Sequence, residues 1–206
     1  MTDAPLLWFL NRGTGVVLLT LLSASMVLGV LSLGGRAAGD GGGRIPRFVT
    51  QSLHRNLALG SVLLVIAHAT TAVVDEYVDI RWWQALVPFG GTYEPLWLGL
   101  GTFSLDLMIA VALTSLLRAR IGLRSWRAVH LTSWLSWAVG VVHGVGIGTD
   151  LKDPHTWATW AAVPSAVSVI AVLLALGWRL STSGERRPVV VATDPRAGVR
   201  SGGGVR

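Results

Sequence analysis

Residues 54–74 read HRNLALGSVLLVIAHATTAVV, a 21-residue run that is almost entirely apolar after its first residues and contains two histidines, His54 and His68. A helix needs about 20 such residues to cross the roughly 30 Å hydrocarbon core of a bilayer. Four other runs have a similar length, at 13–34, 96–117, 127–148 and 156–180. The sequence therefore predicts an all-α membrane protein in which residues 13–180 form one domain of five transmembrane helices.

The composition agrees with a lipid bilayer as the surrounding solvent. Hydrophobic residues make up 51% of the 206 residues, charged residues make up 14%, and the mean hydropathy is +0.57. Cysteine is absent, which excludes disulfides, a thiolate nucleophile and cysteine-ligated iron–sulfur or zinc sites. The net charge of +6 does not indicate nucleic-acid binding, because the arginines do not cluster with aromatic residues on any one segment.

Lysine and arginine are distributed unequally among the connections, and this predicts the orientation. Fourteen of the 17 fall in or beside the first loop, the third loop and the C-terminal segment. Because these residues favour cytoplasmic loops, we expect residues 1–12 outside and the C-terminus inside, in a multi-pass protein of the cell membrane. The first run is too long for a signal peptide and lacks a cationic leader, so we expect it to be retained. Residues 181–206 have little apolar surface, and we expect a disordered cytoplasmic tail.

Four of the five histidines form two pairs, on the second and fourth predicted helices. His54 and His68 are 14 residues apart, and His130 and His143 are 13 residues apart. These spacings correspond to about 21 and 20 Å along a helix axis. Both helices are expected to run from the inner to the outer face. His54 should therefore lie level with His130, and His68 level with His143.

The two spacings differ in their angular consequences. Fourteen residues return to within about 40° of the same helix face, whereas thirteen residues leave an offset of about 140°. The fourth helix must therefore bend, change its winding, or present its two histidines to different sides. Gly140 lies between His130 and His143 and would tolerate a bend.

Two imidazoles at one depth on neighbouring helices are the axial arrangement of a low-spin b-type haem. A neutral imidazole in hydrocarbon loses hydrogen bonds unless other groups replace them, so histidines within a membrane are functional candidates. A lone histidine would more often be a packed interior residue, but four at matched depths predict metal ligands. We therefore expect two bis-histidine haem b groups, on His54 with His130 and on His68 with His143, and an electron path across the bilayer.

The residues around the histidines resemble the ferric reductase-like transmembrane domain family. This family includes the membrane cores of NADPH oxidases and ferric reductases and the haem subunit of the bacterial methionine sulfoxide reductase system. The resemblance rests on the two spacings and on the segments Leu53-His54-Arg55-Asn56-Leu57 and Trp126-Arg127-Ala128-Val129-His130, and it covers roughly residues 7–180. It implies an inner haem on the first histidine of each helix and an outer haem on the second, in the membrane component of an oxidoreductase.

The chain departs from that family after its last predicted helix. In NADPH oxidases and eukaryotic ferric reductases the core continues into flavin and nicotinamide domains, but here about 26 residues follow, and no glycine-rich dinucleotide-binding sequence is present. We expect neither a flavin site nor a catalytic residue in this chain. Electrons would come from a separate flavoprotein or a quinol and pass to an external acceptor, such as ferric iron or a partner protein.

Four further residues are candidates for the surroundings of the site. Asp106, near the middle of the third run, could accept a hydrogen bond from a ligand imidazole, take part in proton movement, or simply be a packed aspartate. Arg12 and Arg55 could neutralise haem propionates, although a charge that sets the topology is an equal interpretation for Arg55. His155 has no partner at its level and is expected to be a surface residue.

Two other functions fit the same residues. A membrane transporter or scaffold protein could use the histidines to bind a metal ion, or only for packing. A cytochrome could instead oxidise quinol and send electrons inward or to an external protein. A b-type haem spectrum would exclude the transporter or scaffold but would fit both electron-transfer functions.

Overall fold

The computed structural model describes residues 4–34, 46–75, 78–152 and 158–183, and every regular element among them is helical. Five long helices are joined by short elements, in the order α1 (Ala4–Gly34), α2 (Arg47–Val74), η1 (Trp82–Ala85), α3 (Pro95–Leu116), α4 (Arg118–Ile121), α5 (Leu123–Ile147), α6 (Thr149–Lys152) and α7 (Thr159–Ser183). The expected all-α architecture is therefore confirmed for the described residues.

Four of the long helices are long and apolar enough to cross a membrane. Their apolar stretches are Leu6–Ser32, Phe48–Val74, Pro95–Leu116 and Thr159–Thr182, which belong to α1, α2, α3 and α7. α5 has 25 residues, which is sufficient length, but its histidines, hydroxyl side chains and tryptophans lower its mean hydropathy. Four helices that could span a membrane are therefore present, and a fifth span stays a prediction.

The helix boundaries differ most from expectation at the starts of α1 and α2. Residues 1–12 were expected to form a separate outer segment, but α1 is helical from Ala4 and continues through Arg12. Pro5 lies in the first turn of α1, where the N–H that proline lacks has no helical partner in any case. α2 begins at Arg47, directly after Pro46. Residues 181–206 were expected to form a disordered tail, but residues 181–183 still belong to α7. Residues 184–206 lie outside the described part of the chain.

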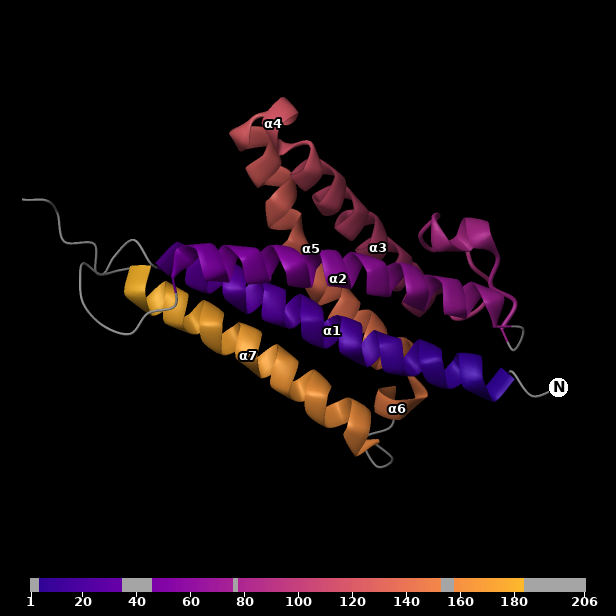
Figure 1. Ribbon diagram of the computed structural model, residues 1–206. Helices are drawn as coiled ribbons and strands as arrows, with labels where there is room; N and C mark the ends of the chain where they lie inside the picture. The colour runs from indigo at the N-terminus through magenta and orange to yellow at the C-terminus, as the bar shows by residue number, and fades with distance from the viewer. Residues whose placement is uncertain (1–3, 35–45, 76–77, 153–157, 184–206) are drawn as a thin grey trace, which may run out of the picture.

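The long helices form two groups. α1 lies between α2 and α7, while α3 and α5 pack against each other, with α4 at their far end, and α5 crosses behind α2 and α1 (Figure 1). The hydroxyl groups of Ser104 and Ser136 each donate to the other residue's carbonyl oxygen, at 2.8 and 2.9 Å, and so join α3 to α5. Trp137 Nε1 donates to Ser23 Oγ at 2.8 Å and joins α5 to α1. The serine pair thus holds α3 and α5 together, and the tryptophan joins this group to the group of α1, α2 and α7.

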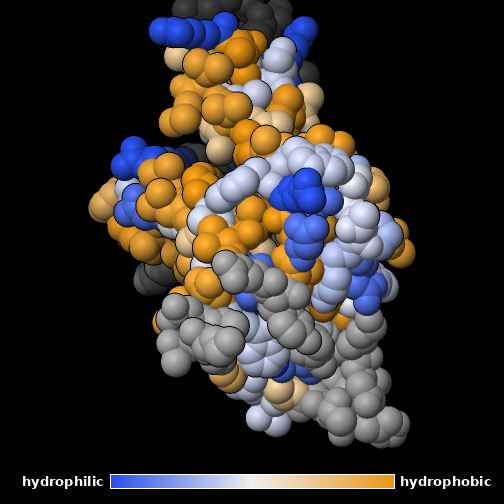
Figure 2. All heavy atoms as spheres, turned by 90° about the vertical axis from the view of Figure 1, so that its right-hand side faces the viewer, coloured by the Kyte–Doolittle hydropathy of each residue, from blue (hydrophilic) through white to orange (hydrophobic). Residues whose placement is uncertain are grey.

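Small side chains fill the interior of the bundle, and large apolar side chains cover its surface. Val172, Ser23 and Ser61 are the largest side chains that are fully buried, whereas Leu63 and Leu174 are 71% and 68% exposed. Figure 2 shows hydrophobic residues over much of the face in view, with hydrophilic residues at the upper end and in separate patches lower down. This distribution fits a lipid environment, in which close helix packing depends on small residues.

Candidate functional site

The first histidine pair consists of His54 on α2 and His130 on α5, and the fold brings the two side chains together. The centres of their rings are 6.2 Å apart, and the ring planes make an angle of 69°. α2 and α5 are not among the helix pairs that pack closely. The two imidazoles therefore meet between helices that otherwise have little contact, at the common level that their positions in the sequence predict.

The second histidine pair consists of His68 and His143, farther along the same two helices. The two side chains are half-buried, and each is hydrogen-bonded to another helix: His68 to Asn11 on α1 and His143 to Trp97 on α3. On each helix the histidine of the first pair precedes the histidine of the second pair. Two helices that run in the same direction would therefore place the two pairs at two successive levels.

Three of the four imidazoles are held in the same way, by a backbone carbonyl on a neighbouring helix. Nδ1 donates a hydrogen bond from His54 to Ser25 O at 2.8 Å, from His68 to Asn11 O at 3.0 Å and from His143 to Trp97 O at 2.7 Å. Because a carbonyl oxygen can only accept, Nδ1 carries the proton in each of these rings and Nε2 keeps its lone pair. Each ring is therefore oriented by one nitrogen and offers the other as a metal ligand.

A glycine lies four residues after each of these carbonyls. A Cβ built on it would approach Cε1 of the imidazole, at 3.5 Å for Gly29, 3.1 Å for Gly15 and 2.5 Å for Gly101. Inside a helix the carbonyl of residue n already accepts the N–H of residue n+4. With glycine at n+4, no side chain covers the carbonyl oxygen, and the imidazole can donate a second hydrogen bond to it. These glycines were missed by the sequence analysis, although Gly15 and Gly29 show the same 14-residue spacing as His54 and His68.

His130 is the exception among the four. Its Nδ1 is buried and has no hydrogen-bond partner in the part of the chain that the structure describes. Its ring instead stacks on Trp126, with the ring centres 4.8 Å apart and the planes at 24°. Cζ of Arg118 lies 4.3 Å from the centre of the Trp126 ring. His130 is thus packed against an indole that carries a cation, and its Nδ1 donates to no carbonyl oxygen among the described residues.

The thirteen-residue spacing explains this difference. α5 is one continuous α-helix, so His130 and His143 are offset by about 140° around its axis. His143 contacts α3, whereas His130 is turned toward α2, and the helix therefore presents its two histidines to different sides. Gly140, expected as a place for a bend, serves another purpose: a Cβ there would lie 3.2 Å from Ser104 Oγ, so the glycine allows α3 to approach closely.

Arg12 lies near the second pair and is already engaged by other side chains. It forms an ion pair with Asp150 of α6. Its Cζ lies 3.8 Å from the centre of the Trp8 ring and 5.4 Å from the centre of the Trp160 ring. Arg12 therefore connects α1, α6 and α7, and its role toward a haem propionate stays a prediction.

The other candidate residues take no part in the imidazole hydrogen bonds. Arg55 is exposed at the position next to His54, and Asp106 is half-buried on α3. Backbone carbonyls, rather than Asp106, accept the three imidazole hydrogen bonds described above. His155 lies outside the described residues, so the expectation that it is a surface residue stays untested.

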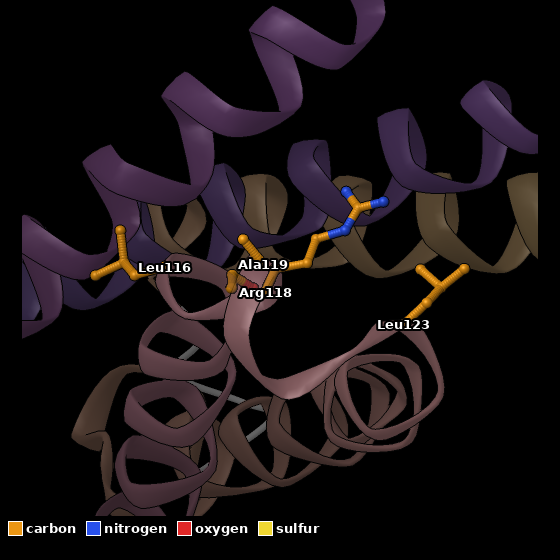
Figure 3. A pocket seen from close by; sticks show the side chains of 5 residues that line it. Leu116, Arg118, Ala119 and Leu123 are labelled. Carbon is orange, nitrogen blue, oxygen red and sulfur yellow. The ribbon is translucent and has the colours of Figure 1, made fainter.

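A shallow groove lies at the end of the α3–α5 pair, beside α4 (Figure 3). Its volume is about 550 Å³, and it is lined by Ser115, Leu116, Arg118, Ala119 and Leu123. Because the Arg118 guanidinium also covers the Trp126 ring, the groove adjoins the stack that ends at His130.

The histidine pairs are not a conventional metal site made of protein ligands alone. In the described ranges, no three or more histidine, aspartate or glutamate side chains form a group that could hold a metal ion. Two imidazoles suit a metal that brings its remaining ligands with it. No protein-family model, curated protein or solved structure matches the chain.

Proposed function

We propose that the chain is a haem b-binding electron-transfer subunit of a membrane oxidoreductase. His54 with His130 and His68 with His143 would each hold one haem. The observation that carries this proposal is the close approach of His54 on α2 to His130 on α5. In addition, His54, His68 and His143 each have Nδ1 fixed by a carbonyl oxygen and Nε2 free. When bound, two haems would supply one-electron carriers at two depths in the bilayer.

The separation of the first pair supports a metal between the two rings. Each imidazole would hold the metal through a ring nitrogen, by a bond of about 2.0–2.1 Å. The centres of His54 and His130 are 6.2 Å apart. The 69° angle between their planes is compatible with this, because each ring can rotate about its bond to the metal.

A transporter or scaffold that binds a bare transition-metal ion has less support. Such ions usually take three or four protein ligands. Within the described residues, no cluster of that size is present. Packing alone also explains little, because three glycines and three carbonyls are arranged around the imidazoles.

The charged residues fit supporting roles in this proposal. Arg55, exposed beside His54, is placed to neutralise a propionate at the first level. At the second level Arg12, which is paired with Asp150, is the candidate for this role. The donor is a separate flavoprotein or a quinol, and the acceptor is an external group such as ferric iron.

We also propose that α5 is a fifth span and that the C-terminus is cytoplasmic. The charge distribution supports this orientation, and the absence of cysteine makes it testable with single introduced thiols. Asp79 is 83% exposed and Ser181 is also exposed. Asp79→Cys should react with an impermeant thiol reagent in intact cells, whereas Ser181→Cys should react only after permeabilisation. Reaction of both from the outside would contradict a five-span topology.

A difference spectrum tests the proposed function. The full chain, purified from cells supplied with haem, should show a b-type reduced-minus-oxidised spectrum. His68→Ala and His143→Ala should each abolish one haem without preventing folding, whereas His155→Ala, a histidine outside both pairs, should keep the spectrum. A folded protein without pigment would refute the proposal.

A further inference from the structure

The stack of Arg118, Trp126 and His130 gives the two histidine pairs different surroundings. In the second pair, both imidazoles donate from Nδ1 to a carbonyl oxygen, at 3.0 and 2.7 Å. In the first pair only His54 does so, while Nδ1 of His130 is buried without a partner among the described residues. The asymmetry comes from the sequence, because a 13-residue spacing turns His130 away from α3.

We propose that Trp126 and Arg118 are positioning residues that give the iron held by His54 and His130 a higher midpoint potential than the iron held by His68 and His143. This inference rests on the proposed function, since it concerns the two haem sites. It goes beyond that function because it ranks the sites and assigns the difference to two residues that do not touch the metal.

The hydrogen bonds act on the potential through the ligands. An imidazole that donates from Nδ1 to a carbonyl is a more basic ligand. A more basic ligand stabilises the oxidised metal and lowers the potential, and hydrogen bonding around a haem is one of the ways in which a protein sets that potential. His68 and His143 both donate such a hydrogen bond, which lowers the potential of the second pair, whereas His130 donates none.

The charges near the first pair also raise its midpoint potential relative to that of the second pair. The guanidinium of Arg118 lies over the Trp126 ring, and that ring stacks on the imidazole of His130. A nearby positive charge favours the reduced state, which carries one more electron. Near the second pair, the charge of Arg12 is balanced by the carboxylate of Asp150. An electron on the two-haem protein should therefore reside mainly at the first pair.

Potentiometry of the purified full chain, followed by optical absorbance, tests this ranking. Two midpoints are expected, and His68→Ala should remove the lower one and leave the higher one. Arg118→Gln should lower only the higher midpoint, and Arg118→Lys should restore it in part. Trp126→Leu should lower the same midpoint and change the electron paramagnetic resonance spectrum of that haem, whereas Trp126→Phe should change it less because a phenyl ring can still stack.

The outcomes separate this inference from the proposed function. A protein without haem refutes both. A two-haem protein with equal midpoints, or one in which His68→Ala removes the higher midpoint, refutes only the ranking. A shift of the lower midpoint in Arg118→Gln would overturn the role of Arg118.

Discussion

Replacing Gly101 with alanine should disturb its histidine more than the matching replacements at Gly15 and Gly29. A Cβ on Gly101 would lie 2.5 Å from Cε1 of His143, which is too close for two carbon atoms. The ring cannot retreat without stretching its 2.7 Å hydrogen bond to Trp97 O. On Gly15 the distance would be 3.1 Å, and on Gly29 it would be 3.5 Å, which is an ordinary contact.

These distances set the expected order of the effects. Inserting a methyl group into a packed site costs about 1–3 kcal/mol, and leaving a buried N–H unpaired costs about 1–3 kcal/mol. Alanine gains up to about 1 kcal/mol over glycine in a helix. The free energy of unfolding should therefore fall by about 2–4 kcal/mol for Gly101→Ala, fall by about 1 kcal/mol for Gly15→Ala, and change by less than about 0.5 kcal/mol for Gly29→Ala.

Thermal unfolding in detergent, with the haem content of each variant, measures this series. Gly177→Ala is the matched control, because a Cβ on that α7 residue meets nothing within 4 Å. Haem should be lost first from Gly101→Ala and not from the control. If Gly29→Ala were as damaging as Gly101→Ala, or if Gly101→Ala had no effect, the glycine–carbonyl arrangement would not be what holds the imidazoles.

Two contacts between helices give further predictions. Asp150→Asn removes the charge that balances Arg12, at a site where the two side chains are 12% and 17% exposed, and should lower the free energy of unfolding by about 1–3 kcal/mol; unchanged denaturation curves would show that the pair is not needed. Trp137→Phe loses the 2.8 Å hydrogen bond to Ser23 and should cost about 1 kcal/mol. In a double-mutant cycle with Ser23→Ala the two losses should not add, and full additivity would argue against this contact.

Much of the fold could be predicted from hydropathy alone, because lipid requires apolar runs of a defined length. α3 and α7 lie within three residues of the predicted bounds. The early starts of α1 and α2 could not be found in this way. Hydropathy identifies only the apolar part of a helix. The helix starts are instead marked by proline, Pro5 in the first turn of α1 and Pro46 directly before α2.

The pairing of the histidines followed from spacing, but the groups that hold them did not. A backbone carbonyl is present at every residue, so Ser25, Asn11 and Trp97 carry no signal of their own. Asp106 was a candidate acceptor for an imidazole hydrogen bond because a carboxylate is unusual in a membrane. In the structure, backbone carbonyls with a glycine four residues later accept these hydrogen bonds instead. The 13-residue spacing predicted that His130 and His143 point to different sides of their helix. It did not predict that the ring of His130 stacks on Trp126, which only the structure shows.

The molar ratio of extractable haem b to polypeptide, in full-length protein purified from haem-supplied cells, tests the central claim most directly. The two proposed sites, His54 with His130 and His68 with His143, should give two haems per chain. A well-folded preparation with a ratio of zero would contradict the account.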